Sequence, residues 1–198
     1  MNFGVKPARR MGPAGSENWN AMLDGAERIL RDEGHAALTS RRVADEIGVK
    51  QRLIYYYFAT MDELIVQTFR QLSERELLRL REATASSRPL REIWAICMHS
   101  TDARLIAEFM ALANRIAPLA EEVVHFVEES RALQVKALGA ALQRSGAKLE
   151  VPLAGLALFA TSTALTLTRE SQLGIAAGHA EALDLIERLL GRLEPDPA

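Results

Sequence analysis

The chain of 198 residues is 48% hydrophobic and 25% charged, which is typical of a soluble globular chain of one or two domains. Its net charge of −2 excludes bulk basicity as a sign of nucleic-acid binding. Positive charge is weakly biased to the N-terminal end, because residues 1–60 hold nine Lys and Arg against seven Asp and Glu, while the remainder holds fifteen against nineteen. The one cysteine, Cys97, excludes an internal disulfide, so we expect a reducing, cytoplasmic location and a buried structural thiol.

The opening segment, residues 1–18, is predicted to be a disordered basic arm. It carries Lys6, Arg9 and Arg10 together with two prolines and three glycines, and it contains no apolar run. This composition fits neither a signal peptide nor a helix. Such an arm could reach into the minor groove of DNA, or it could be a tail that only meets solvent.

The first predicted helix runs from Trp19 to Arg31, where apolar residues recur at the helical period, and Gly34 ends it. It covers the next two helices and completes a three-helix domain over residues 19–60. Its apolar face holds Met22, Leu23, Ala26, Ile29 and Leu30. The shared core also takes Leu38, Val43, Ile47, Ile54 and Phe58.

Residues 38–64 have the spacing of a helix-turn-helix. The hydroxyl pair Thr39 and Ser40 opens a short helix, because such side chains accept hydrogen bonds from the free N–H groups of a first turn. Gly48 ends this helix where a residue with positive φ is needed, and Lys50 begins the second helix.

The second helix of this pair has distinct inward and outward faces. With Ile54 taken as the inward direction, the aromatic residues three and four positions later lie within about 60° of it. Arg52, Tyr55 and Tyr56 therefore point outward, where an Arg can bind guanine and a Tyr can reach phosphate or a thymine methyl group. The alternative is a three-helix packing element whose aromatic cluster is simply core.

The stretch GHAALTSRRVADEIGVKQRLIYYYFATMDEL resembles the DNA-binding domain of the tetracycline-repressor (TetR) family of transcriptional regulators. In that family a Gly ends the first helix, a Thr-Thr or Thr-Ser pair opens the second, Ala-x-x-x-Gly-Val makes the turn, and Leu-Tyr-x-His/Tyr-Phe closes the third. The matching residues are Gly34, Thr39 with Ser40, Ala44 to Val49, and Ile54 to Phe58. The resemblance and the outward face together imply DNA contacts by Thr39, Ser40, Arg41, Arg42, Lys50, Gln51, Arg52, Tyr55 and Tyr56.

Three residues depart from the family pattern. Leu53 stands where the family usually has a Thr that contacts phosphate, Met61 replaces a phosphate-binding Lys, and Arg52 occupies a position that is often Gly. Arg52 could supply an unusual base contact. The two missing phosphate contacts keep an alternative function open, namely a helical ligand-binding or scaffold protein that has lost DNA affinity.

The remaining residues, 61–198, are predicted to form a helical ligand-binding and dimerisation domain, which makes the whole fold all-α. A long helix runs from Met61 to about Arg81 without Gly or Pro, and no β-run bounded by turns follows it. In the resembling family this helix carries the ligand signal to the DNA-binding domain. Further helices are expected at about Leu90–His99, Asp102–Asn114, Pro118–Ser145, Pro152–Glu170 and His179–Leu193.

Apolar side chains between Leu90 and Leu142 predict a ligand cavity, because a site inside a helical bundle is a core left partly unfilled. We expect a small hydrophobic effector with one polar end, met by a His, Asn or Arg of this region. The same aromatic and methionine residues could instead be plain core. The candidate ligand-binding residues are Trp94, Met98, His99, Phe109, Met110, Asn114, Arg115, Phe126 and Arg131.

The last two helices are predicted to form a homodimer interface, as they do in the resembling family. Residues 151–168 carry no charge, which just meets the length of a membrane span, but a proline, a glycine and five hydroxyl residues favour a helix buried against other helices. An intramolecular core is the alternative. The expected interface residues are Ala157, Thr161, Ala164, Leu183, Ile186 and Leu190.

Patterns of catalytic or metal-binding chemistry are lacking in the sequence. The four histidines are scattered without metal-ligand spacing, and there is no Gly-rich phosphate loop, nucleophile elbow or calcium loop. We therefore predict no enzymatic activity, no metal and no cofactor. The sequence predicts a homodimeric, ligand-responsive repressor that a small hydrophobic effector releases from a palindromic operator in double-stranded DNA.

Overall fold

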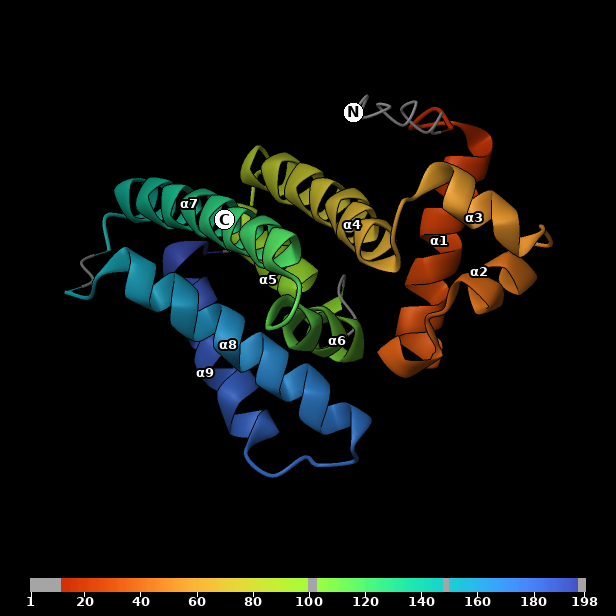
Figure 1. Ribbon diagram of the computed structural model, residues 1–198. Coiled ribbons are helices and arrows are strands. Elements are labelled where there is room, and N and C mark those ends of the chain that lie inside the picture. Colours follow the sequence, from red (N-terminus) through yellow and green to blue (C-terminus); the bar gives the residue numbers. More distant parts are fainter. Residues whose placement is uncertain (1–11, 100–102, 148–149, 196–198) are drawn as a thin grey trace. The chain divides into compact units, whose positions relative to one another are not determined.

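The computed structural model describes residues 12–99, 103–147 and 150–195 (Figure 1). Every regular element in these ranges is a helix, so the predicted all-α fold is confirmed. The chain forms two compact units, residues 1–71 and 72–198. The division falls inside helix α4 (Met61–Thr84), whereas the sequence analysis placed the domain boundary at the start of that helix.

The first unit contains α1 and a helix-turn-helix. Helix α1 begins earlier than expected because Ser16 caps it, its hydroxyl accepting a hydrogen bond from the Trp19 N–H at 3.4 Å. The expected arm therefore contributes residues 12–18 to the folded unit, and its residues 1–11 lie outside the described residues. The elements are α1 (Glu17–Asp32), a short 3₁₀ helix (His35–Ala37), α2 (Ser40–Glu46), α3 (Gln51–Tyr57) and the first turns of α4.

The core of the first unit joins α1 to the helix-turn-helix through aromatic contacts. The ring centroids of Trp19 and Phe58 lie 4.3 Å apart, and Phe58 and Ile54 are almost completely buried. Between α2 and α3 the chain turns at Gly48, whose φ of 70° lies in the left-handed region that glycine adopts without strain. This turn holds α3 against α1 and leaves the opposite side of α3 exposed.

The second unit is a bundle in which α8 packs against α5, α7 and α9 (Figure 1). Helix α7 ends at Ser145, and Gly146 after it adopts the left-handed conformation that commonly follows a helix. No helix in the described part of the chain is long and apolar enough to cross a membrane. The helices are α5 (Pro89–His99), α6 (Ala103–Ala113), α7 (Ala117–Ser145), α8 (Leu153–Gln172) and α9 (His179–Leu193), all within two residues of the predicted bounds.

A buried carboxylate closes this bundle. Glu194 follows α9 and is 6% exposed. Its side chain accepts hydrogen bonds from the backbone N–H groups of Leu90 at 2.9 Å and Arg91 at 3.2 Å, in the first turn of α5. A carboxylate is stabilised there because the first N–H groups of a helix have no partner within the helix. The contact holds the end of α9 against the start of α5.

Candidate DNA-binding surface and ligand cavity

The outward face of α3 carries the residues that helical geometry predicted. Tyr55 and Tyr56 are 37% and 43% exposed, whereas Ile54 is 1% exposed. Arg52 is also exposed. One guanidinium and two phenol rings therefore line the solvent side of this helix, and such groups can contact base edges and phosphates.

A hydrogen-bond network joins α2 to α3 beside this face. The amide nitrogen of Gln51 donates to the Ser40 hydroxyl oxygen at 2.8 Å, and the Ser40 hydroxyl donates to the Tyr55 hydroxyl oxygen at 3.0 Å. Ser40 itself is buried. The network leaves the O–H of Tyr55 and the amide oxygen of Gln51 as groups that DNA could meet.

The cations of this unit fall into two classes. The guanidinium of Arg42 binds Glu33 at 2.6 Å and Glu46 at 2.9 Å, and these hydrogen bonds, first that of Glu33, raise the pKa of Arg42. Arg41, Lys50 and Arg52 are exposed, and their side chains have no hydrogen-bond or ion-pair partner among the described residues. These three positive charges are available to phosphate. Thr39 caps α2 by accepting a hydrogen bond from the Arg42 N–H at 3.1 Å.

The segment before α1 contacts the end of α3. The Gly12 N–H donates to the Tyr56 carbonyl at 3.0 Å, and a Cβ atom at Gly12 would lie 2.3 Å from the Tyr57 ring. Hydrogen bonds with Ser16, and then with Asn18, lower the pKa of the Tyr57 phenol. The chain entering α1 is thus attached to the end of α3.

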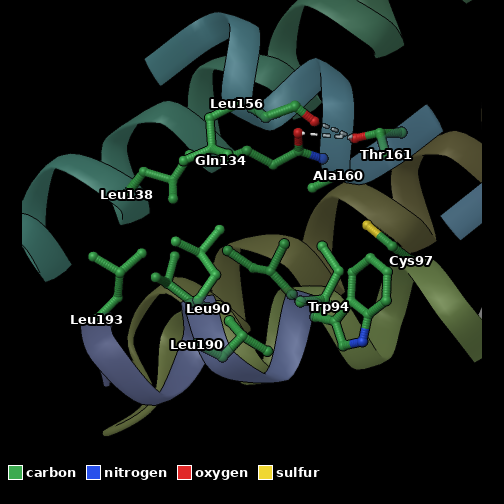
Figure 2. Close-up of a pocket in the computed structure, with 14 residues that line it drawn as sticks. Leu90, Trp94, Cys97, Gln134, Leu138, Leu156, Ala160, Thr161, Leu190 and Leu193 are labelled. Atoms are coloured by element: carbon green, nitrogen blue, oxygen red, sulfur yellow. Dashed lines mark hydrogen bonds between the residues drawn. The ribbon is translucent and has the colours of Figure 1, made fainter. Parts of the chain in front are cut away.

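A cavity of about 70 Å³ lies inside the second unit, between α5, α7, α8 and α9 (Figure 2). Its wall is almost entirely apolar, and no charged side chain lines it. The hydroxyl of Thr161 lies 3.2 Å from the amide oxygen of Gln134 and 2.9 Å from the Ala157 carbonyl oxygen. The lining residues are Leu90, Ile93, Trp94, Cys97, Gln134, Leu138, Leu156, Ala157, Ala160, Thr161, Ile186, Leu189, Leu190 and Leu193.

The helix-turn-helix residues match a known family. The model of the bacterial regulatory proteins of the tetR family matches residues 22–68, which cover α1 through the first turns of α4. The helix-turn-helix domain of this chain belongs to the tetR family. The HTH-type transcriptional regulator BetI of Rhizobium meliloti is 32% identical over 69 residues. That match spans 35% of this chain and only 30% of BetI.

Solved structures of tetR-type regulators share the fold over most of the chain. A putative TetR/AcrR regulator superposes with a TM-score of 0.74 at 15% identity, covering 86% of this chain and 97% of that one. A TetR regulator from Haloarcula marismortui gives 0.70 at 16% identity, covering 86% and 94%. The fatty acid degradation regulator FadR from Bacillus halodurans gives 0.69 at 14% identity, covering 90% and 96%. These similarities show that the tetR-type fold extends through both units.

Two departures from the tetR pattern are explained by local packing. Leu53 and Met61 are both half-buried, so each apolar side chain is partly covered by its own domain. Next to Met61, the Thr60 hydroxyl accepts a hydrogen bond from the Glu63 N–H at 3.1 Å and caps α4. The capping does not depend on the missing lysine.

The structure brings one of the nine candidate ligand-binding residues, Trp94, to the cavity. Phe109 is buried outside the cavity lining, while Met98, Phe126 and Arg131 are half-buried and do not line it. Met110, Asn114 and Arg115 are exposed, and the Asn114 amide donates to the Met110 carbonyl at 3.2 Å. The side chain of His99 lies outside the described residues.

The expected interface residues lie mostly inside the single chain. Ala157, Ala164 and Leu190 are buried within it, and Thr161 and Ile186 line the cavity with Ala157 and Leu190. Leu183 is exposed. Within one chain the small and apolar side chains of α8 and α9 thus pack against the chain's own helices, and the intersubunit contact stays a prediction.

Sequence reasoning missed Gln134, and it named Thr161 only as an interface residue and not as a residue of the cavity. A signal was present for the first, because Ser130, Gln134, Ala137 and Ala141 follow the helical period and share the buried face of α7. A glutamine among small and apolar residues on a buried face marks a polar contact. No local pattern connects it to Thr161 on another helix.

Proposed function

We propose that this protein is a DNA-binding transcription regulator that uses α3 as its recognition helix. The observation that carries the proposal is the outward face of α3, where Arg52 and Tyr56 are exposed while Arg41 and Lys50 lie nearby in sequence without partners among the described residues. Members of the tetR family are DNA-binding transcription regulators rather than enzymes, which supports this assignment. Arg52 would read bases, and Arg41 and Lys50 would bind phosphate.

We also propose a homodimer that binds a near-palindromic operator. Large apolar side chains are exposed on α8 and α9, and they include Leu158, Phe159 at 75% exposure, and Leu183. Apolar side chains gathered on neighbouring helices mark an interaction surface. Two copies joined there would present two recognition helices to half-sites about 34 Å apart, one turn of DNA, or a multiple of that distance.

The regulator is proposed to be a ligand-responsive repressor. The cavity in the second unit would hold an effector, and α4 continues without a break from residue 61 to residue 84, across the division between the two units. An effector that shifts α4 would change the separation of the two recognition helices and lower operator affinity by about 1 to 3 kcal/mol. Operator DNA must then weaken effector binding by the same factor.

The test begins with selection of binding sites from a random double-stranded DNA library. The selected DNA is then titrated by fluorescence anisotropy at about 50 to 200 mM salt, where counterion release makes affinity fall with salt. We expect a near-palindrome to be enriched, and Arg41→Ala and Lys50→Ala each to reduce the salt slope. Failure to bind DNA even at about 50 mM salt, with no enriched sequence, would favour the alternative, a helical ligand-binding or scaffold protein that has lost DNA affinity.

A further inference from the structure

The polar end of the cavity has a hydrogen-bond donor without an acceptor. Gln134 is 8% exposed, and its amide oxygen pairs with Thr161. Its amide nitrogen has no hydrogen-bond partner among the described residues. Figure 2 shows this amide beside Thr161 and Ala160, across the cavity from Leu90 and Leu190. This nitrogen is not one of the fully buried side-chain atoms that lack a partner among the described residues, so it borders open space. A ligand that places an acceptor there gains a hydrogen bond in an otherwise apolar site.

The rest of the cavity wall offers a water molecule few hydrogen-bond partners. A buried water is held by two to four polar partners, whereas most of this wall is leucine, isoleucine and alanine. An apolar molecule gains affinity from the same wall because it leaves water on binding. The cavity thus combines one hydrogen-bonding end with an apolar body.

The cavity also selects against charge. Its lining contains no Lys, Arg, Asp, Glu or His. Burial, and next the charge of Glu76, raises the pKa of the Cys97 thiol to about 11, so the thiol is neutral near pH 7. A carboxylate placed here would lose its hydration without gaining an opposite charge, and this would oppose its binding.

We propose that this cavity binds an uncharged small molecule whose apolar body is one small ring or a short chain. The molecule carries a single hydrogen-bond acceptor, such as a ketone, ester or amide carbonyl. This acceptor receives a hydrogen bond from the Gln134 amide nitrogen. The proposal names the chemistry of the effector and rests on the proposed function only for its regulatory consequence. The cavity volume of about 70 Å³ limits the body to this size.

The test uses four probes built on one six-membered ring, without DNA. Cyclohexanone has a neutral acceptor, and methylenecyclohexane replaces its oxygen by CH₂. Cyclohexanecarboxylate carries a charge, and cyclohexanecarboxamide is its neutral counterpart of the same size. Ligand binding is followed by calorimetry and by the side-chain amide signals of Gln134 in ¹H–¹⁵N NMR spectra, which are assigned by triple-resonance spectra of the wild-type protein. We expect cyclohexanone to shift these signals, and cyclohexanecarboxamide to bind at least about tenfold more tightly than the carboxylate.

The variants separate the hydrogen bond from the fit of the apolar body. Gln134→Leu should weaken cyclohexanone binding about tenfold while leaving methylenecyclohexane binding equal or stronger. The matched control is Gln143→Leu on the exposed side of α7, which should change neither. Equal losses for both probes, or carboxylate binding as tight as carboxamide binding, would overturn the proposal.

The wild-type protein provides a test that does not depend on the folding of the Gln134→Leu variant. If Gln134→Leu does not fold, the amide signals of the wild-type protein decide, and their failure to respond to saturating cyclohexanone overturns the proposal. If the protein binds the ketone but not DNA, the proposal for the cavity holds and the proposed regulatory function is refuted. If it binds DNA but not the ketone, the proposed regulatory function holds and the proposal for the cavity is refuted.

Discussion

Ser40 on α2 and Tyr55 on α3 are joined hydroxyl to hydroxyl at 3.0 Å, fifteen residues apart in the chain. Because Gln51 also donates to Ser40, one buried serine orients two residues of the proposed recognition helix. The DNA-binding face therefore depends on a residue that is itself buried.

Replacing Ser40 by Ala should lower both stability and DNA affinity. The change removes two hydrogen bonds and is expected to lower the free energy of unfolding by about 1 to 3 kcal/mol. Operator affinity should fall as well, because Gln51 and Tyr55 lose their anchor. Tyr55→Phe removes only one of these bonds and should have the smaller effect on stability in urea titrations. Unchanged operator affinity in Ser40→Ala would contradict the orienting role.

Arg52 and Arg42 should behave differently when each is replaced by Ala. Arg52→Ala is expected to cost about 1 to 3 kcal/mol of operator binding and to relax sequence preference at one position in each half-site. Arg42→Ala breaks ion pairs with Glu33 and Glu46, so its main effect should be on thermal stability. Anisotropy with a set of single-base operator variants measures the first effect. Intact preference in Arg52→Ala would refute its base-reading role.

Two glycine substitutions should change stability in opposite directions. Gly48→Ala places a Cβ in open space but at a φ of 70°, so it should destabilise by about 1 to 2 kcal/mol through backbone strain alone. Gly191→Ala lies within α9, also in open space, and should stabilise by about 0.5 to 1 kcal/mol because alanine loses less entropy in a helix. Urea titrations in which both substitutions change the free energy of unfolding in the same direction would contradict this account.

Phe159→Asp tests the proposed dimer face. Phe159 is 75% exposed in the single chain, so a charge there should leave the protomer folded and separate the dimer in light scattering. Val124→Asp on α7 replaces another exposed apolar residue and should remain dimeric. Ile186 is unsuitable for this test because it lines the cavity and its replacement would also disturb the chain's own core. A Phe159→Asp dimer would place the interface elsewhere.

Cys97 should react slowly with iodoacetamide in the folded protein. Thiolate is the reacting species, and a pKa raised from 9.0 to about 11 lowers its fraction at pH 8 about a hundredfold relative to the unfolded chain. Because the pKa of the thiol is higher in the folded state, the thiol contributes fully to the free energy of unfolding below pH 9. This contribution is lost as pH rises toward 11. Cys97→Ala should lack that loss. Equal alkylation rates in native and urea-unfolded protein would contradict the burial.

Local features of the sequence determined the helices and the turn. The apolar period of α9, the hydroxyl at Thr39 and the glycine at Gly48 each act over one or two turns of chain, so their effect can be predicted without knowing the fold. The same holds for the outward direction of Arg52, because a helix rotates by a constant angle per residue.

Only the tertiary structure decided which helix faces meet. Gln134 and Thr161 are 27 residues apart, and nothing local in either helix specifies their contact, which depends on how α7 and α8 cross. For the same reason the apolar stripe containing Leu190 was predicted to contact a second subunit, with the chain's own core as the alternative. A helical period defines an apolar face, but the surface that covers it is chosen by packing among all the helices at once.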